Sequence, residues 1–144
     1  MQLLLIADKD NDARRQMADI FGPEEYQVIE AESVDVALHE VLKGDVRVVV
    51  LGSEFDGLPA RELIPLLKKC KKDLTIILVS NDESLPLLRR FRREGIFYHS
   101  LKPISEDDKN ELRQVVKCAF ENSSDKLCST DVFREKVGLK EYPV

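Results

Sequence analysis

The feature that most constrains this chain is an apolar run from Val46 to Leu51, with Val-Val-Val-Leu at positions 48–51. A strand that is apolar at consecutive positions is buried on both faces, as in a parallel sheet covered by helices on each side. The run ends at Gly52, Ser53 and Glu54, so the pattern predicts a central strand that leads into a loop. The residue at its carboxyl end, Gly52, is the one on which the function depends.

Four other segments have strand length and composition, and a helical pattern follows each of the five strands. The segment at 26–31 alternates more than the others, which is typical of an outer strand. The predicted strands are Leu3–Ala7, Tyr26–Ala31, Val46–Leu51, Leu74–Val79 and Ile96–Leu101. Strand and helix therefore alternate five times, which predicts an α/β fold with an open parallel sheet and helices on both faces.

Capping residues and breakers give the expected helix limits. Asn11 or Asp12 is expected to cap the first helix, and Ser33 the second, which Gly44 ends. The third helix is expected from Pro59 to Lys72. The fourth and fifth helices are expected to start at Ser84 and Ser105. Within the third helix, Pro65 removes a hydrogen bond at a cost of about 3 kcal/mol, so a kink or a late start is expected.

The chain of 144 residues is long enough for one domain with its own core. That domain is expected to span residues 1–121. A composition shift at Asn-Ser-Ser-Asp then predicts a linker and C-terminal extension at 122–144, with one short helix from Thr130 to Val137.

Composition and motifs exclude several classes of function. The net charge of −5 gives no support for direct nucleic-acid binding. No apolar run is long enough to cross a membrane, and the N-terminus lacks the basic lead of a signal peptide. The three cysteines lack metal spacing and suit reduced thiols in a cytoplasm. Only two histidines, His39 and His99, are present, and no nucleophilic triad, Walker loop, GxGxxG or HExxH occurs. No catalytic, cofactor or metal residues are therefore assigned.

In folds of this kind the functional crevice lies outside the carboxyl ends of the strands. Four polar stretches should meet there: Asp8-Lys9-Asp10, Gly52-Ser53-Glu54, Ser80-Asn81 and Lys102-Pro103.

Four segments in order resemble a bacterial response-regulator receiver of the CheY-like type. They are Leu-Leu-Ile-Ala-Asp at 4–8, Tyr-Gln-Val-Ile-Glu-Ala at 26–31, Arg-Glu-Leu at 61–63 and Gly-Ile-Phe-Tyr-His-Ser-Leu-Lys-Pro at 95–103. The resemblance implies a flavodoxin-like, doubly wound sheet of five strands in the order 2-1-3-4-5.

Receivers use an acid pair after the first strand to hold Mg²⁺, and an aspartate after the third strand as nucleophile. They also use a hydroxyl residue after the fourth strand, and a lysine before a proline after the fifth. The cations neutralise charge around the transferred phosphoryl group. Carried over, Asp8 matches the first acid, Ser80 the hydroxyl residue and Lys102 the lysine. Pro103 follows a cis bond in the family, and the sequence leaves its isomer open here.

Two positions depart from the pattern. Gly52 stands where the nucleophilic aspartate should be, and the spacing to Glu62-Leu63 supports that register. Lys9 stands where the second acid should be. Asp8 alone supplies too few oxygen ligands for the octahedral coordination that Mg²⁺ requires. Lys9 is instead expected to pair with Asp8. These positions predict a pseudo-receiver that acts as a protein-interaction module without aspartate phosphorylation.

Two alternatives stay open. One is a receiver that is phosphorylated at a non-standard acid, Glu54 or Asp56, with Glu54 also able to act as a built-in charge. The other is a flavodoxin-like domain that binds a small ligand, such as an anion held by Asp8, Ser80 and Lys102.

The resemblance also points to a partner surface. Receivers commonly dimerise or bind targets through the fourth helix, fifth strand and fifth helix. Here Arg89, Arg90, Arg92 and Arg93 lie on the predicted fourth helix, and arginine suits acidic partners. His99 occupies the position of an aromatic residue that turns inward on activation. The lysines at 68, 69, 71 and 72 are interpreted as a solubilising helix end.

Overall fold

The computed structural model of the chain describes residues 2–21, 25–52, 54–55, 58–80, 96–100 and 102–124. Seven strands are present in this part of the chain. They are β1 (Gln2–Ala7), β2 (Tyr26–Ala31), β3 (Val48–Gly52), β4 (Glu54–Phe55), β5 (Leu58–Pro59), β6 (Thr75–Val79) and β7 (Tyr98–Ser100). The expected helices from Ser84 and from Thr130 to Val137 lie outside the described residues.

Five of these strands form one parallel sheet in the order β2-β1-β3-β6-β7. Counted within this sheet, the order is 2-1-3-4-5, so the predicted flavodoxin-like fold is confirmed. The first strand pairs with neighbours on both sides, with Leu4 opposite both Val28 and Val48. The remaining two strands, β4 and β5, form a short antiparallel hairpin where only a loop was expected after the central strand.

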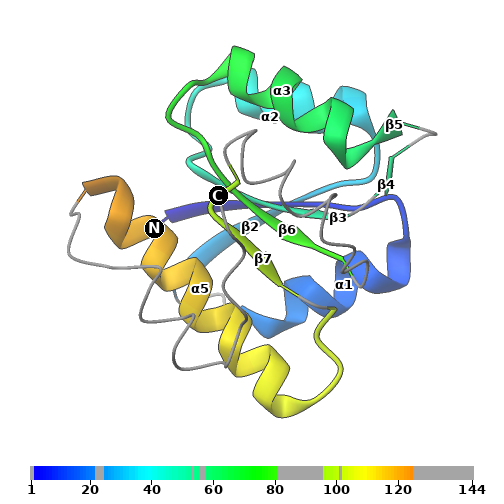
Figure 1. Cartoon of the computed structure of the whole chain (residues 1–144), viewed down its shortest axis with the longest axis vertical. Helices are drawn as coiled ribbons and strands as arrows, with labels where there is room; N and C mark the ends of the chain where they lie inside the picture. Colours follow the sequence, from blue (N-terminus) through cyan, green and yellow to red (C-terminus); the bar gives the residue numbers. More distant parts are fainter. Residues whose placement is uncertain are drawn as a thin grey trace, which may run out of the picture.

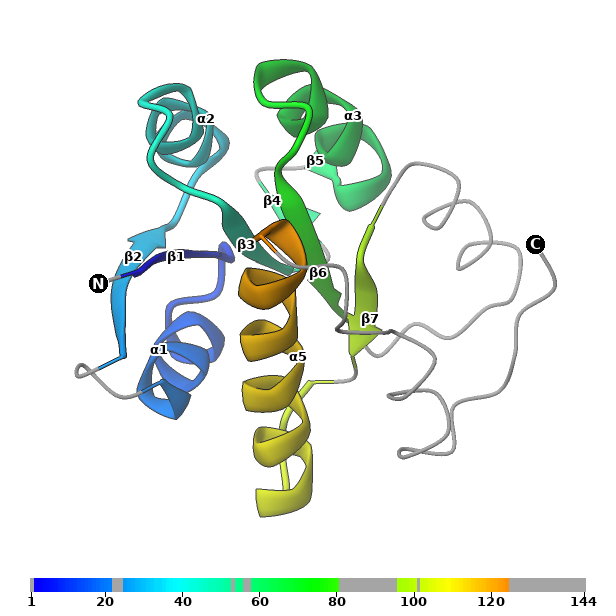
Figure 2. The same ribbon diagram turned by 90° about the vertical axis from the view of Figure 1, so that its left-hand side faces the viewer.

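Helices cover both faces of the sheet (Figures 1 and 2). They are α1 (Asn11–Ile20), α2 (Val34–Leu42), α3 (Ala60–Cys70) and α5 (Glu106–Ser124). Figure 2 shows α1 and α5 on one side of the sheet and α2 and α3 on the other. The fold is therefore three layers, helices on either side of a sheet.

Alternate side chains of the buried strands build two separate cores. On the α1 and α5 side, Leu4, Val48 and Val50 pack with residues of α5 such as Leu112 and Val116. On the other side, the intervening strand residues pack with α2 and α3. Val48, Val49, Val50 and Leu51 are fully buried, which explains the uninterrupted apolar run in the sequence.

The N-cap of α1 is Asp10, and the expectation of Asn11 or Asp12 was wrong. The Oδ1 atom of Asp10 accepts hydrogen bonds from the amides of Asp12 (2.9 Å) and Ala13 (3.3 Å). All three residues are short and polar, so composition alone could not separate them. The Ser33 cap of α2 is confirmed, because its Oγ accepts from the Val36 amide.

The third helix begins at Ala60 and continues through Pro65 to Cys70, so the late start was not needed. The last helix begins as expected. The Ser105 Oγ accepts from the Asp108 amide, and the Asp108 carboxylate accepts in return from the Ser105 amide. The helix then continues to Ser124, beyond the expected start of the linker at Asn122.

Two of the lysines at the end of α3 have structural roles, contrary to the expectation of a solubilising helix end. Lys68 Nζ donates to the carbonyl of Leu74 (2.7 Å), and Lys71 Nζ donates to the carbonyls of Gly44 (3.0 Å) and Val46 (2.5 Å). These bonds fasten the end of α3 to the loops before β3 and β6. Burial lowers the pKa of the Lys68 ammonium.

The cysteines also differ from expectation. Cys70 is a free, exposed thiol, whereas Cys118 on α5 is disulfide-bonded. The expectation of reduced thiols is therefore wrong for Cys118.

No helix in the described part of the chain is long and apolar enough to cross a membrane.

Candidate functional site

The carboxyl ends of the central strands carry the residues of the predicted crevice. Asp8 directly follows β1, Gly52 is the last residue of β3, and Ser80 directly follows β6. Lys102 lies shortly after β7, the neighbour of β6. The parallel sheet therefore places these positions along one edge, as the sequence predicted.

The Asp8 side chain occupies the space next to Gly52 that a side chain at position 52 would need. A Cβ atom built on Gly52 would lie 2.5 Å from Oδ2 of Asp8 and 2.6 Å from its Cγ, closer than real Cβ contacts. The backbone of Gly52 does not require glycine, since it lies in a paired strand. What glycine provides here is room for the Asp8 carboxylate.

Asp8 is held in that position at only 9% exposure. Its Oδ1 accepts a hydrogen bond from the Asp10 amide (2.9 Å). Burial raises the pKa of the Asp8 carboxyl, and this effect outweighs the Asp10 amide bond and the attraction of Lys102, both of which lower the pKa. The carboxylate is thus enclosed, with Lys102 the strongest cationic influence on it.

Lys9 does not pair with Asp8, so that expectation was wrong. Lys9 is exposed, and the charged side chains that act on Asp8 are Lys102, Asp10 and Arg14. Because side chains of consecutive residues at a strand end point to different sides, the lysine turns outward while Asp8 turns in. The cation that acts most strongly on Asp8 is instead Lys102, from the segment that follows the fifth strand of the sheet.

Ser80 and Lys102 complete the crevice. Ser80 is buried, and its amide donates to the carbonyl of Ser100 (2.9 Å), which continues the pairing of β6 with β7. Lys102 is exposed. There is no cis peptide bond among the described residues, so Pro103 follows a trans bond.

Residues 4–124 match the sequence profile of the response regulator receiver domain. The chain belongs to the response regulator receiver family. It is a receiver domain of two-component signalling.

Individual relatives agree with this assignment. Sporulation initiation phosphotransferase F of Bacillus subtilis (strain 168) is 25% identical over 114 residues, which cover 79% of this chain and 90% of that protein. The signal receiver domain of an HD domain-containing protein from Pseudomonas fluorescens Pf-5 superposes with a TM-score of 0.76 at 20% identity, covering 85% of this chain and 89% of that one. A CheY-like receiver from Methanospirillum hungatei JF-1 gives 0.74 at 18% identity, with 86% and 98% covered.

The acids present do not fit a receiver's Mg²⁺ site. Among the side chains that the structure describes, Asp8 is the one carboxylate enclosed in the crevice, and Asp10 is engaged as the cap of α1. Lys9 stands at the second acidic position of the receiver. Within the described residues, no cluster of three or more potential metal-ligating side chains occurs. Mg²⁺ requires near-octahedral oxygen ligation, which one shielded carboxylate does not provide.

Arg14 is a member of this site that the sequence did not reveal. It is 8% exposed and donates from Nη1 to the carbonyl of Asp8 (2.9 Å), from Nε to Glu30 (3.0 Å) and from Nη2 to Asn11 (2.6 Å). The arginine thereby fixes the backbone that carries the Asp8 carboxylate. The acid at Glu30, on the neighbouring strand, was the one signal that could have suggested a buried arginine.

The proposed partner surface is only partly described. Tyr98 on β7 is buried, and its hydroxyl donates to Glu111 on α5 (3.0 Å), which joins the strand to the helix. Burial raises the pKa of both Tyr98 and Glu111. His99 is half-buried on the edge strand, with its Nε2 atom enclosed. The arginines at 89, 90, 92 and 93 lie outside the described residues.

The two acids considered as substitute acceptors are likewise little described. Glu54 lies in β4 of the short hairpin, and Asp56 lies outside the described residues.

Proposed function

We propose that this receiver is a pseudo-receiver, a regulatory protein-interaction module that acts without aspartate phosphorylation. It is not an enzyme on this proposal, because autophosphorylation of a receiver requires an acceptor and a divalent cation. It works inside the cytoplasm, as the sequence suggested, and requires no cofactor or metal.

One observation carries the proposal: the carboxylate of Asp8 occupies the space beside Gly52. In a working receiver an aspartate side chain at position 52 would project there. Here the space is filled by an acid that belongs to the metal-binding position. The losses of acceptor and of metal site are therefore linked, since the residue that should hold Mg²⁺ has taken the place of the nucleophile.

Asp8 itself makes a poor substitute nucleophile. It is enclosed, its Oδ1 is committed to the Asp10 amide, and burial raises its pKa. A shielded carboxylate with one oxygen already committed is a weak attacking group for a phosphoryl donor.

The test is incubation with acetyl phosphate and Mg²⁺, followed by intact-mass measurement. A receiver that carries an aspartate at the acceptor position serves as the positive control. The expected result is no added phosphoryl mass and no Mg²⁺-dependent rise in melting temperature. A bound ligand at 100 times its dissociation constant would stabilise by about 2.7 kcal/mol, which is easily detected.

A phosphoryl adduct that maps to Glu54, Asp56 or Asp8 would overturn the proposal in favour of a non-standard acceptor. The variant Lys9→Asp with Gly52→Asp provides a matched gain-of-function control. It restores both acidic positions, so an Mg²⁺ response in this variant alone would show that the rest of the crevice is competent.

The interaction surface is proposed to be β7, α5 and the segment 81–95. The support is the family's use of this face, the Tyr98–Glu111 bond and the sequence cluster of arginines. Charge reversal at Arg90 and Arg93 should weaken self-association or target binding while leaving stability within about 0.5 kcal/mol. Sedimentation at low and high salt would measure it, and association that is indifferent to both changes would place the interface elsewhere.

A further inference from the structure

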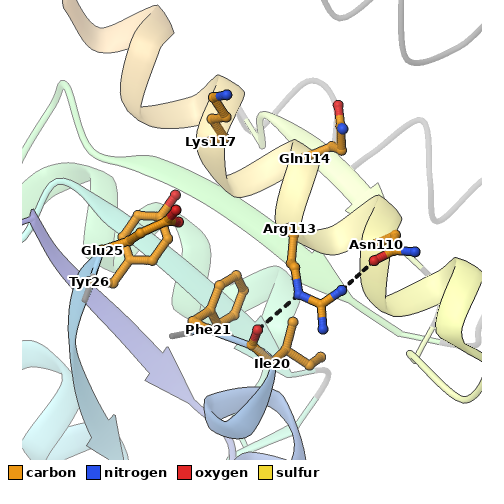
Figure 3. A pocket seen from close by; sticks show the side chains of 8 residues that line it. All are labelled: Ile20, Phe21, Glu25, Tyr26, Asn110, Arg113, Gln114 and Lys117. Carbon is orange, nitrogen blue, oxygen red and sulfur yellow. Dashed lines mark hydrogen bonds between the residues drawn. The ribbon is translucent and has the colours of Figure 1, made fainter. Parts of the chain in front are cut away.

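A pocket of about 170 Å³ lies between α1, the start of β2 and α5 (Figure 3). It is formed where α1 ends and β2 begins, whereas Asp8 lies where β1 ends and α1 begins. Because α1 runs back across the sheet from the carboxyl edge, the pocket is at the other end of this helix from the crevice. Nothing in the pseudo-receiver proposal uses it.

The inner wall of this pocket is aromatic and rigid. Tyr26 is buried, with Phe21 edge-on to it at 5.7 Å and Phe120 stacked against it at 5.4 Å between ring centroids. The packed rings of Phe21 and Tyr26 therefore give the pocket an apolar floor.

The outer wall, on α5, carries two cations. Arg113 and Lys117 are four residues apart, so they lie on the same side of the helix. Like charges at that spacing weaken a helix, and the chain as a whole is acidic with a net charge of −5. Arg113 and Lys117 therefore give this edge of the pocket a positive charge in a chain that is acidic overall.

Two of the three nitrogens of the Arg113 guanidinium make hydrogen bonds, which fix the orientation of the group. Its Nε donates to the carbonyl of Ile20 (3.0 Å) and its Nη1 to Asn110 (Figure 3). Neither Nη2 nor the ammonium of Lys117 makes a hydrogen bond or ion pair with the residues that the structure describes. The pocket thus presents the held guanidinium of Arg113 beside an aromatic floor, with Lys117 one turn further along α5 (Figure 3).

We infer that this pocket binds one acidic side chain, a glutamate or aspartate, of a protein partner. The volume is below the roughly 300–1,000 Å³ of small-molecule sites, and near the roughly 150 Å³ that accommodates a single benzene-sized group. A glutamate would place its methylene groups on Phe21 and Tyr26 and its carboxylate against Arg113 and Lys117.

The negative charge of Glu25 should oppose the binding of an acidic side chain, so this residue provides a second test. It lines the same pocket, is exposed, and contributes with burial to raising the pKa of Tyr26. Removing its charge should strengthen binding of an acidic side chain, while removing the Lys117 charge should weaken it. A purely structural role for these residues predicts neither change.

The test uses three blocked pentapeptides, Ala-Ala-X-Ala-Ala, in which X is Glu, Gln or Lys. Each is titrated into the isotope-labelled full chain, and amide shifts are followed together with the Nε–H signal of Arg113. The Glu peptide should shift Arg113, Tyr26 and Lys117, and the Gln and Lys peptides should not. Lys117→Gln should weaken the affinity about threefold, and Glu25→Gln should strengthen it, both effects shrinking in high salt.

Lys109→Gln is the matched control, because it makes the same charge change on α5 outside the pocket, where Lys109 pairs with Glu106 at 3.8 Å. It should leave peptide binding unchanged. Equal shifts with the Glu and Gln peptides, no shift at millimolar peptide, or shifts centred on Lys102 would overturn the inference. Inorganic phosphate that gives the same shifts at lower concentration would do so too, by making the pocket a small-anion site.

Discussion

Two arginines bind the backbone at the two ends of α1, and they differ in how many of their guanidinium nitrogens make hydrogen bonds. Arg14 is buried beside the crevice and donates to the carbonyl of Asp8, to Glu30 and to Asn11. Arg113 is exposed beside the pocket and donates to the carbonyl of Ile20 and to Asn110. The first guanidinium is used from all three nitrogens, while the second keeps Nη2 for another acceptor.

At the crevice the arginine makes a hydrogen bond from every nitrogen, whereas at the pocket the arginine keeps one donor that a ligand could use. At the crevice, Asp8 fills the space of a missing side chain, and Arg14 fixes the backbone behind it. The Oδ1 atom of Asp8 is bonded to the Asp10 amide. At the pocket, donors face a hollow that no described side chain fills. On the two proposals made above, the crevice lacks the family's chemistry and the pocket at the other end of α1 binds a partner.

The largest expected effect comes from Arg14→Met. It leaves the buried Asp8 carbonyl without its donor, which costs up to about 3 kcal/mol. It also removes the ion pair with Glu30, which adds little because the Glu30 side chain is 40% exposed. Arg113→Met should lose only about 1 kcal/mol, since its bonds are more exposed and water can replace them. Urea unfolding of both variants measures the contrast. Equal losses would mean that the two ends of α1 are held alike.

Gly52→Ala should give the next effect. The new Cβ displaces the Asp8 carboxylate and breaks its bond to the Asp10 amide, a form of overpacking that costs about 1–3 kcal/mol. In an Asp8→Ala background nothing remains to be displaced, so the cost of Gly52→Ala should largely disappear. The resulting coupling between the two sites should be about 1–2 kcal/mol.

Gly44→Ala is the control for this cycle. Gly44 follows α2 with a φ of 89°, and a Cβ there would meet nothing within 4 Å. Its substitution should cost about 1 kcal/mol through backbone conformation alone. That cost should be the same with or without Asp8. If Gly52→Ala is equally independent of Asp8, the carboxylate does not fill the space as described.

The parallel sheet with helices on both faces and the positions at the crevice could be predicted because both follow from local patterns, whereas the order of the strands came from the resemblance to receivers. The uninterrupted apolar run at 48–51 requires a strand buried on both faces, and parallel strands bring Asp8, Gly52 and Ser80 to one edge. The local pattern did not indicate that the Asp8 carboxylate fills the space beside Gly52, because these two residues are distant in sequence. It also did not indicate that Arg14 is buried and donates to the Asp8 carbonyl. The pocket depends on packing between α1 and α5, so no linear pattern indicated it.

The smallest expected effect is on Asp8 itself, where Asp8→Asn should stabilise the domain at neutral pH. The amide keeps an oxygen that can accept from the Asp10 amide, but it carries no charge to be desolvated. Burial raises the pKa of Asp8 in the folded protein above its ordinary value of 3.8. The folded state therefore binds the proton more tightly than the unfolded state, and stability is lost as the pH rises through the folded pKa.

Asparagine does not titrate, so Asp8→Asn escapes that loss. The stability that Asp8→Asn gains should be present at pH 7 and should shrink as the pH falls through the folded pKa of Asp8. It should amount to about 1 kcal/mol at most, because the attraction between Asp8 and Lys102 is also lost.

Asp108→Asn provides a control of opposite sign. Hydrogen bonds from the Ser105 and Ile104 amides lower the pKa of Asp108, so its carboxylate stabilises the fold above pH 3.8 and that contribution is lost in acid. Thermal unfolding of the two variants from pH 3 to pH 8 would compare them. A destabilised Asp8→Asn at pH 7 would contradict this prediction. It would show that the attraction of Lys102 for the Asp8 carboxylate outweighs the cost of burying that charge, so that the crevice favours a bound anion.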